Sequence, residues 1–412
     1  MNIKNTNLSN GLTVITCPQK ETGKITLCGL IKAGSIYDPG DKHGLSNITA
    51  RMISSSLASY AEKYKKIKAG LKFTLHDSNY YTENIRFEIT ANPRDLAAFL
   101  NIFCHYLINP DFGKEDFSKI KGEIKDELSE KINTVEFKKQ NIIYNQNYPE
   151  NHPYNHYYMG NEESLENISF EDVVNFYKTH YIPNNTIIGI TEPVKAENTE
   201  NLLKQYLGNW KKCKDINLSF PPFKENKRNV AILAGELEEG SYAMILSTPT
   251  ISRTSPDYYA LNILNYTLGA NPYENKLMDN LLKEGADYAF SVFPPALAAS
   301  CWQINISFNT PDKLDKVIET VNKVLLKISS EELSDEELKR TKNYFTERFP
   351  LLMEMPGNLA LMLALTEYYG LGTDYFDKYK TYYTAVSGGN IQTLARKYLN
   401  PDTLNILIIK ED

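Results

Sequence analysis

An alternating pattern followed by a helical one is the clearest local signal in the first half of the chain. Ile85, Phe87 and Ile89 alternate with polar residues, which predicts a half-buried strand. Asn92 and Pro93 come next and suit a helix cap and a first helical turn. Apolar residues then recur at three- and four-residue spacing, which predicts an amphipathic helix through Leu96, Phe99, Leu100 and Phe103.

The same order of patterns returns in the second half of the chain. Residues 302–308 alternate between apolar and polar, and Pro311 follows them. Residues 314–325 then carry apolar residues at helical spacing. Pro311 thus stands in the second block where Pro93 stands in the first.

A second pair of matching blocks has nearly the same offset. Tyr181 is followed by Ile-Pro-Asn-Asn and the apolar run 186–190, and Tyr398 by Leu-Asn-Pro-Asp and the run 403–409. The separation of these two tyrosines nearly equals the separation of Pro93 and Pro311. Two matched blocks at nearly one offset predict an α+β protein of two homologous domains, each a mostly antiparallel sheet with helices packed on one face.

The boundary between the repeats is predicted from composition. Residues 211–228 are charged, contain two consecutive prolines and lack periodicity, which is typical of a linker. We therefore expect an N-terminal domain over residues 1–210 and a C-terminal domain over residues 229–412. The length of 412 residues favours two domains over one.

Composition narrows the classes of partner. The net charge of −6 and the absence of a basic stripe argue against nucleic acid. The apolar run 359–365 is far shorter than the about 20 residues that cross a bilayer, so no membrane is expected. Residues 1–20 lack the pattern of a secretory signal.

The five cysteines are scattered without a CxxC pair, which argues against a disulfide framework and favours a cytoplasmic location.

Short motifs stand in a consistent order along nearly the whole chain. They are Asn-Gly-Leu-Thr-Val at 10–14, Lys-Ala-Gly-Ser-Ile-Tyr-Asp at 32–38, Gly-Leu at 44–45, His-Pro-Tyr at 152–154, Gly-Asn-Glu-Glu-Ser-Leu at 160–165, Tyr-Ile-Pro-Asn-Asn at 181–185, Leu-Lys-Arg-Thr-Lys-Asn-Tyr at 338–344 and Tyr-Gly-Leu-Gly at 369–372. With these motifs in this order, the chain resembles the pitrilysin/insulinase-type metallopeptidases, which include the mitochondrial processing peptidases.

The resemblance identifies a degenerate zinc motif. Active members carry H-x-x-E-H on the first helix, where two histidines bind zinc and the glutamate activates water. Here Asn47, Ala50 and Arg51 stand at those positions. Asparagine is a poor zinc ligand beside imidazole, arginine stays protonated and repels a cation, and alanine offers no base. We therefore expect no catalytic residue and no metal at this motif.

Glu127 matches the remaining zinc ligand of the family, a glutamate on a later helix. Its separation from Arg51 is close to the family spacing, and it borders an apolar stripe. The hypothesis is that Glu127 pairs with Arg51 where active members hold zinc. The alternative is one more solvated glutamate on a charged helix.

Active members also place an Arg and a Tyr from the second domain against the substrate. Tyr288 fits the tyrosine and is the substrate-binding candidate, whereas Leu282 stands at the arginine position and the segment is one residue short. Lys276 and Lys283 are the nearby cations that would replace the arginine. The alternative is that Tyr288 is an ordinary tyrosine of the strand pattern 288–292.

The histidines do not form a recognisable metal motif. His152 and His156 are four residues apart, but Pro153 predicts a loop there, so a shared metal is not expected. His43 lies four residues before the first zinc position and would need new partners to hold a metal. His180 is isolated and is expected to be structural.

These observations predict the zinc-less half of a heterodimer. The chain would complete a closed chamber and hold a peptide or unfolded polypeptide as an added β-strand, while a zinc-bearing homologue supplies the cofactor and cuts. One alternative is a peptide-binding or scaffold protein, with self-pairing as a homodimer. The other is a peptidase whose metal site has moved to His43 and Glu127.

Overall fold

The structure is a computed structural model that describes residues 1–20, 23–63, 72–76, 82–194, 199–223, 228–235, 241–309 and 313–411. Of residues 58–63 and 72–76 only the backbone is described. Residues 310–312, which include Pro311 of the second repeat block, and residues 224–227 of the predicted linker lie outside these ranges.

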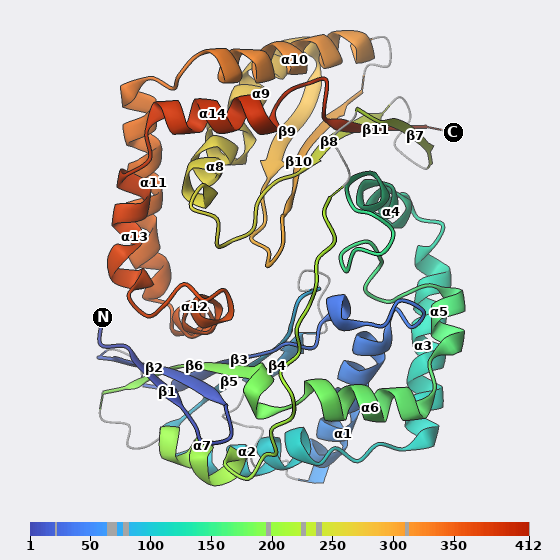
Figure 1. Cartoon of the computed structure of the whole chain (residues 1–412), viewed down its shortest axis with the longest axis vertical. Helices are drawn as coiled ribbons and strands as arrows, with labels where there is room; N and C mark the ends of the chain where they lie inside the picture. The colour runs from blue at the N-terminus through green and yellow to red at the C-terminus, as the bar shows by residue number, and fades with distance from the viewer. Residues whose placement is uncertain are drawn as a thin grey trace. The chain divides into compact units, whose positions relative to one another are not determined.

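The first sheet has the strand order β1-β2-β6-β3-β5-β4 in the described residues (Figure 1). Its neighbouring strands are antiparallel except for the parallel pair β2 and β6. The strands are β1 (Lys4–Asn7), β2 (Thr13–Gln19), β3 (Ile25–Ile31), β4 (Lys72–His76), β5 (Ile85–Ala91) and β6 (Thr186–Pro193).

The second sheet has the order β7-β11-β8-β10-β9 and one parallel pair, β7 and β11. Without β1, the first sheet shows the same order and the same position of its parallel pair, which confirms the internal repeat. The fold is therefore α+β with two mixed, mostly antiparallel sheets. The strands are β7 (Val230–Ala234), β8 (Tyr242–Pro249), β9 (Ala286–Val292), β10 (Cys301–Phe308) and β11 (Asn405–Lys410).

The α-helices also follow the repeat, and the predicted amphipathic segments fall in α2 and α10. In the first half they are α1 (Leu45–Lys63), α2 (Pro93–Ile108), α3 (Lys114–Lys131), α4 (Val135–Asn147), α5 (Glu162–Asn167), α6 (Phe170–His180) and α7 (Thr199–Leu207). In the second half they are α8 (Tyr258–Asn265), α9 (Lys276–Leu281), α10 (Leu314–Ser330), α11 (Asp335–Met353), α12 (Pro356–Tyr368), α13 (Tyr375–Thr384) and α14 (Gly388–Tyr398).

Each of the two compact units is built from both halves of the chain. The first unit comprises Met1–Ser129, His156–Ser219 and Pro350–Asp377, and the second Glu130–Asn155, Phe220–Phe349 and Lys378–Asp412. Helix α12 therefore belongs with the first sheet and α4 with the second. The boundaries 1–210, 211–228 and 229–412 describe the sequence repeat, not this packing, and stay a prediction.

The first sheet is covered on both faces. On one face, the ring of Phe87 on β5 packs against Phe103 of α2, at 4.9 Å between ring centroids. On the other face, Gly189 of β6 lies against the backbone of α12, because a Cβ on this glycine would stand 2.0 Å from the carbonyl oxygen of Ala360. Strand β3 between them is buried along its whole length. Helix α12 thus adds a second layer to the helices expected on one face.

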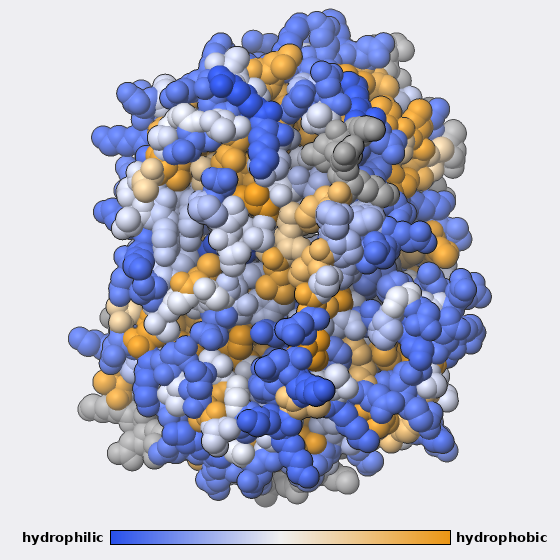
Figure 2. Space-filling model, in the orientation of Figure 1, coloured by the Kyte–Doolittle hydropathy of each residue, from blue (hydrophilic) through white to orange (hydrophobic). Residues whose placement is uncertain are grey.

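The visible surface is mainly hydrophilic, with apolar side chains in scattered patches (Figure 2). Within the described ranges, no single helix has both the length and the apolar composition to cross a membrane. The pair α11 and α12 meets that test only when taken together, and it is bent by 111° at its break.

His180 at the end of α6 is buried, as the structural role expected of it requires. Its ring stacks on Phe176 at 4.1 Å between centroids, and its Nδ1 lies 3.3 Å from the carbonyl oxygen of Lys32. Burial, only partly offset by this carbonyl, lowers the pKa of His180 to about 4. The folded state therefore holds this imidazole neutral at neutral pH.

Replacing His180 by Phe is expected to reduce the acid sensitivity of the fold. In the unfolded chain His180 takes up a proton below its ordinary pKa of 6.5, whereas in the folded chain it stays neutral down to about pH 4. The free energy of unfolding therefore falls as the pH drops from 6.5 to 4. For this one group the loss between pH 7 and pH 5 is about 2 kcal/mol. Urea unfolding of both chains at the two pH values measures it, and an equal loss in wild type and variant would contradict the assignment.

Candidate functional site

The helix that carries the degenerate motif begins at a tight turn. Gly44 has φ +99°, and a Cβ there would stand 2.5 Å from the carbonyl oxygen of Met159, so only glycine fits. The two carboxylate oxygens of Asp38 accept hydrogen bonds from the backbone N–H groups of Gly44 and Ser46, both at 2.7 Å. These bonds satisfy donors at the helix start and fix the direction of α1.

The motif positions lie in the first two turns of α1. Asn47 is 3% exposed and Ala50 is fully buried, so neither presents a reactive group to solvent. The Oδ1 atom of Asn47 has no hydrogen-bond partner among the described residues. Arg51 lies one turn after Asn47 on the same helix face, as the second histidine of the family motif does.

Arg51 of α1 and Glu127 of α3 form the predicted ion pair. The Nη1 atom of Arg51 donates to Oε1 of Glu127 at 2.6 Å, and Nη2 donates to Oε2 at 3.0 Å. Two parallel charge-assisted hydrogen bonds are the strongest geometry that this pair of side chains can adopt. The two positions singled out by the family spacing therefore do come together in space.

Zinc does not fit this arrangement. The guanidinium of Arg51 bonds both oxygens of Glu127, the carboxylate that would otherwise remain as a ligand. A metal would have to displace a permanent cation and would find no imidazole in its place. Ala50 offers no group to activate water, so these four residues cannot perform zinc-dependent hydrolysis.

Glu127→Ala is expected to destabilise the chain by about 1 kcal/mol. The side chains of Arg51 and Glu127 are 20% and 41% exposed, so solvent screens the pair and keeps the effect well below that of a buried one. Glu123→Ala on the same helix is the matched control, because its ion pair with Lys119 is long and exposed. Urea denaturation measures the free energy of unfolding of both variants. Equal losses in the two would show that the ion pair between Arg51 and Glu127 does not stabilise the fold.

Tyr288 lies on β9, which ends the second sheet of the described residues and pairs with β10 on one side only. Tyr288, Phe290 and Val292 are exposed by 50%, 38% and 41%. The rings of Tyr288 and Phe290 stack at 5.5 Å between centroids. A register shift in the pairing with β10 leaves Asp287 without a cross-strand partner, which is typical of a β-bulge.

The cations proposed to replace the missing arginine differ in their surroundings. Lys276, the first residue of α9, forms an ion pair with Glu337 at 2.8 Å. Lys283 is exposed in the short turn before β9, next to Leu282, which is 62% exposed at the arginine position. Whether Tyr288 or either lysine contacts a substrate stays a prediction.

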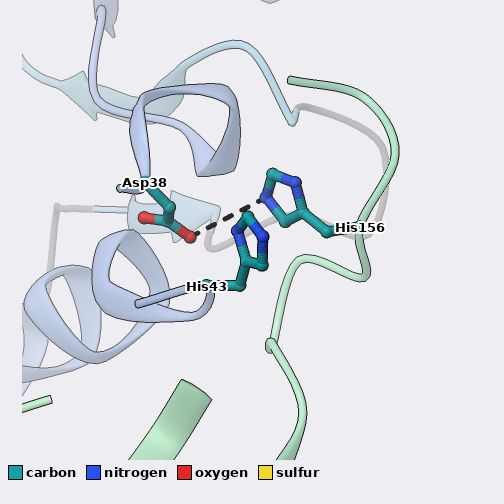
Figure 3. A group of neighbouring side chains, drawn as sticks. All are labelled: Asp38, His43 and His156. Carbon is teal, nitrogen blue, oxygen red and sulfur yellow. Dashed lines mark ion pairs between the residues drawn. The ribbon is translucent and has the colours of Figure 1, made fainter. Parts of the chain in front are cut away.

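No pattern in the sequence connects His43 with His156, because the two residues lie far apart along the chain. In the structure both rings lie beside Asp38 (Figure 3). Glu127, the partner considered for His43 in a shifted metal site, is not part of this group.

Two parts of the chain match models of known protein families. Residues 14–154 match the family described as insulinase, peptidase family M16, and residues 167–345 match the peptidase M16 inactive domain. A search of the curated proteins finds no match.

Solved structures match over nearly the whole chain. One is a peptidase M16 inactive domain from Pseudomonas fluorescens, with 17% identity, a TM-score of 0.88 and coverage of 100% of this chain and 99% of that one. Another is a protease from Helicobacter pylori, with 19% identity, a TM-score of 0.84 and 99% coverage of both chains. A chain of Complex III2 from Candida albicans has 14% identity and a TM-score of 0.77, covering 99% of this chain and 96% of that one.

Proposed function

We propose that this chain, which belongs to the insulinase (M16) family of peptidases, is a non-catalytic subunit of an M16 zinc metallopeptidase. It completes the chamber and holds an extended peptide, while a zinc-bearing homologue cuts. The subunit thus supplies peptide binding, and the zinc and the general base come from its partner.

The ion pair between Arg51 and Glu127 is the observation that carries this proposal. It occupies two of the three positions that bind zinc in active members, and Ala50 removes the base. A chain that kept hydrolysis would need these groups, whereas a chain that only holds substrate does not. The pair also replaces the charge of the lost metal with a fixed cation, which keeps Glu127 neutralised.

Strand β9 supports the peptide-holding part of the proposal. Its outer edge has no strand partner in the described part of the chain, so its backbone groups are suited to pair with an added strand. The exposed row Tyr288, Phe290 and Val292 provides apolar contacts for alternate side chains of that strand. An extended, partly apolar peptide is the ligand that fits both features.

Replacing Val292 by Asp is expected to weaken binding of a labelled unfolded peptide at least about tenfold, because it places a charge in the apolar row. Val230→Asp is the matched control: Val230 is 50% exposed and lies on β7, the opposite edge strand of the same sheet. Fluorescence anisotropy measures both affinities. Equal weakening by the two substitutions, or by neither, would remove β9 from the proposal.

The partner is tested by capture and reconstitution. The tagged chain is recovered from its native lysate, and co-eluting chains are identified by mass spectrometry. The expected result is a stoichiometric homologue with an intact H-x-x-E-H, and peptide hydrolysis by the pair but by neither chain alone. Zinc-dependent hydrolysis by this chain alone would overturn the proposal.

The alternative is a peptide-binding or scaffold protein without peptidase activity. A similarly folded chain occurs in Complex III2 from Candida albicans, which shows that this fold takes part in large assemblies. Recovery of the chain alone as a homodimer, with peptide binding and no turnover, would favour this alternative.

A further inference from the structure

Three side chains with metal-binding atoms converge beside the start of α1, separate from the degenerate motif. They are Asp38, His43 and His156, and one ligand atom from each lies within 4.8 Å of the other two. Figure 3 shows the two imidazole rings on top of each other, with a ring nitrogen of each directed toward the carboxylate of Asp38. Two imidazoles and one carboxylate are a common donor set for zinc and other first-row divalent metals.

Two of the three side chains are enclosed. The side chains of Asp38 and His156 are 0% and 7% exposed, and Nε2 of His156 lies 3.9 Å from Oδ2 of Asp38. The rings of His43 and His156 stack at 3.9 Å between centroids, with 15° between their planes. The buried Nδ1 atom of His43 has no hydrogen-bond partner within the described ranges. A buried polar atom without a partner costs free energy, which a ligand at this point would recover.

Asp38 is held in place for such a role. Each of its oxygens accepts one backbone N–H at 2.7 Å, and a carboxylate oxygen has a second lone-pair direction. Hydrogen bonds of this kind orient ligating carboxylates in metal sites. The same two bonds tie the ligand to the first turn of α1.

The charge states of the two imidazoles suit a cation. Burial lowers the pKa of His43, and burial together with the neighbouring His43 lowers that of His156 to about 3, so both imidazoles are neutral at pH 7. Neutral imidazole is the form that binds metals. Burial raises the pKa of Asp38 to about 8, so this carboxyl is mostly protonated at pH 7 and has to release its proton when a metal binds.

Metal binding has a second identifiable cost, besides the proton released by Asp38. Nε2 of His156 lies 3.0 Å from the carbonyl oxygen of Ser35, a distance at which Nε2–H donates a hydrogen bond. To bind a metal, this nitrogen must give up its hydrogen, which moves to Nδ1 as the ring changes tautomer. The site is therefore expected to bind with lower affinity than a preformed one.

We propose that Asp38, His43 and His156 form a binding site for a first-row divalent metal ion. The ion joins the start of α1 to His156, the residue at which the chain re-enters the first compact unit. Three protein ligands leave a fourth coordination position for water. The proposal does not depend on the proposed function, because the site includes neither Arg51 nor Glu127.

The test is titration of the chelator-treated full chain with Co²⁺, a zinc substitute whose absorption reports its ligands. We expect one Co²⁺ per chain and displacement by Zn²⁺. His43→Ala and His156→Ala are each expected to weaken binding more than about tenfold. Glu127→Ala, which changes the family zinc position, and His105→Ala, which removes an exposed histidine, are expected to leave it unchanged.

Two results would overturn the site: no stoichiometric Co²⁺ in the wild-type chain, or affinity that His43→Ala leaves unaltered. Circular dichroism checks the fold of each variant. The His43 side chain is less buried than that of His156, so His43→Ala alone decides the question if His156→Ala does not fold. Loss of binding in Glu127→Ala would place the metal at the degenerate motif and would also contradict the proposed function.

Discussion

A variant with Asn47→His and Arg51→His is expected to bind one more zinc ion per chain than its parent. The two positions are one turn apart on α1, so two imidazoles would share a helix face. Glu127 already lies within hydrogen-bond distance of the residue at position 51 and would lose its competing guanidinium. Two histidines and a glutamate then complete a catalytic-type zinc site, with affinity expected to rise by more than about 100-fold.

Zinc content after dialysis is measured in the His43→Ala background, so that the site proposed beside Asp38 does not contribute. Adding Glu127→Ala to the variant should abolish the gained ion. Zinc retained in that variant, or no gain in the first, would show that the positions of the motif no longer converge. Hydrolysis is not expected from the double substitution, because Ala50 still lacks the general base.

Gly189→Ala is expected to destabilise the first compact unit by about 3 kcal/mol or to prevent folding. The added Cβ would stand 2.0 Å from the carbonyl oxygen of Ala360 and 2.9 Å from the amide nitrogen of Ala364. Both are backbone atoms of α12 and cannot rotate away, so the helix has to separate from β6. Much of the burial of the central strands would be lost with it.

Gly122→Ala is the matched control for the same chemical change. Gly122 lies inside α3, and nothing stands within 4 Å of its added Cβ. Alanine there should stabilise the chain by about 0.5–1 kcal/mol through helix propensity. Urea unfolding measures both variants. If Gly189→Ala costs less than about 0.5 kcal/mol, α12 does not pack directly on β6.

Periodicity and spacing in the sequence were sufficient for the repeat and the two-domain α+β class, and the family resemblance was sufficient for the loss of the zinc motif. These features are local or recur at a fixed offset, so no knowledge of contacts is needed to recognise them. The pair Arg51 and Glu127 was also predictable, because the family spacing identifies two positions that converge in space.

Other features depended on tertiary structure. An apolar helix pattern reports that a face is buried but not which sheet covers it, so the exchange of α4 and α12 between the sheets has no signal in periodicity. The alternation at Tyr288, Phe290 and Val292 is the same for a central and an edge strand, and only the strand order places it at the edge. His43 and His156 meet because a loop returns to the start of α1, and no local pattern records a contact between residues so distant in the sequence.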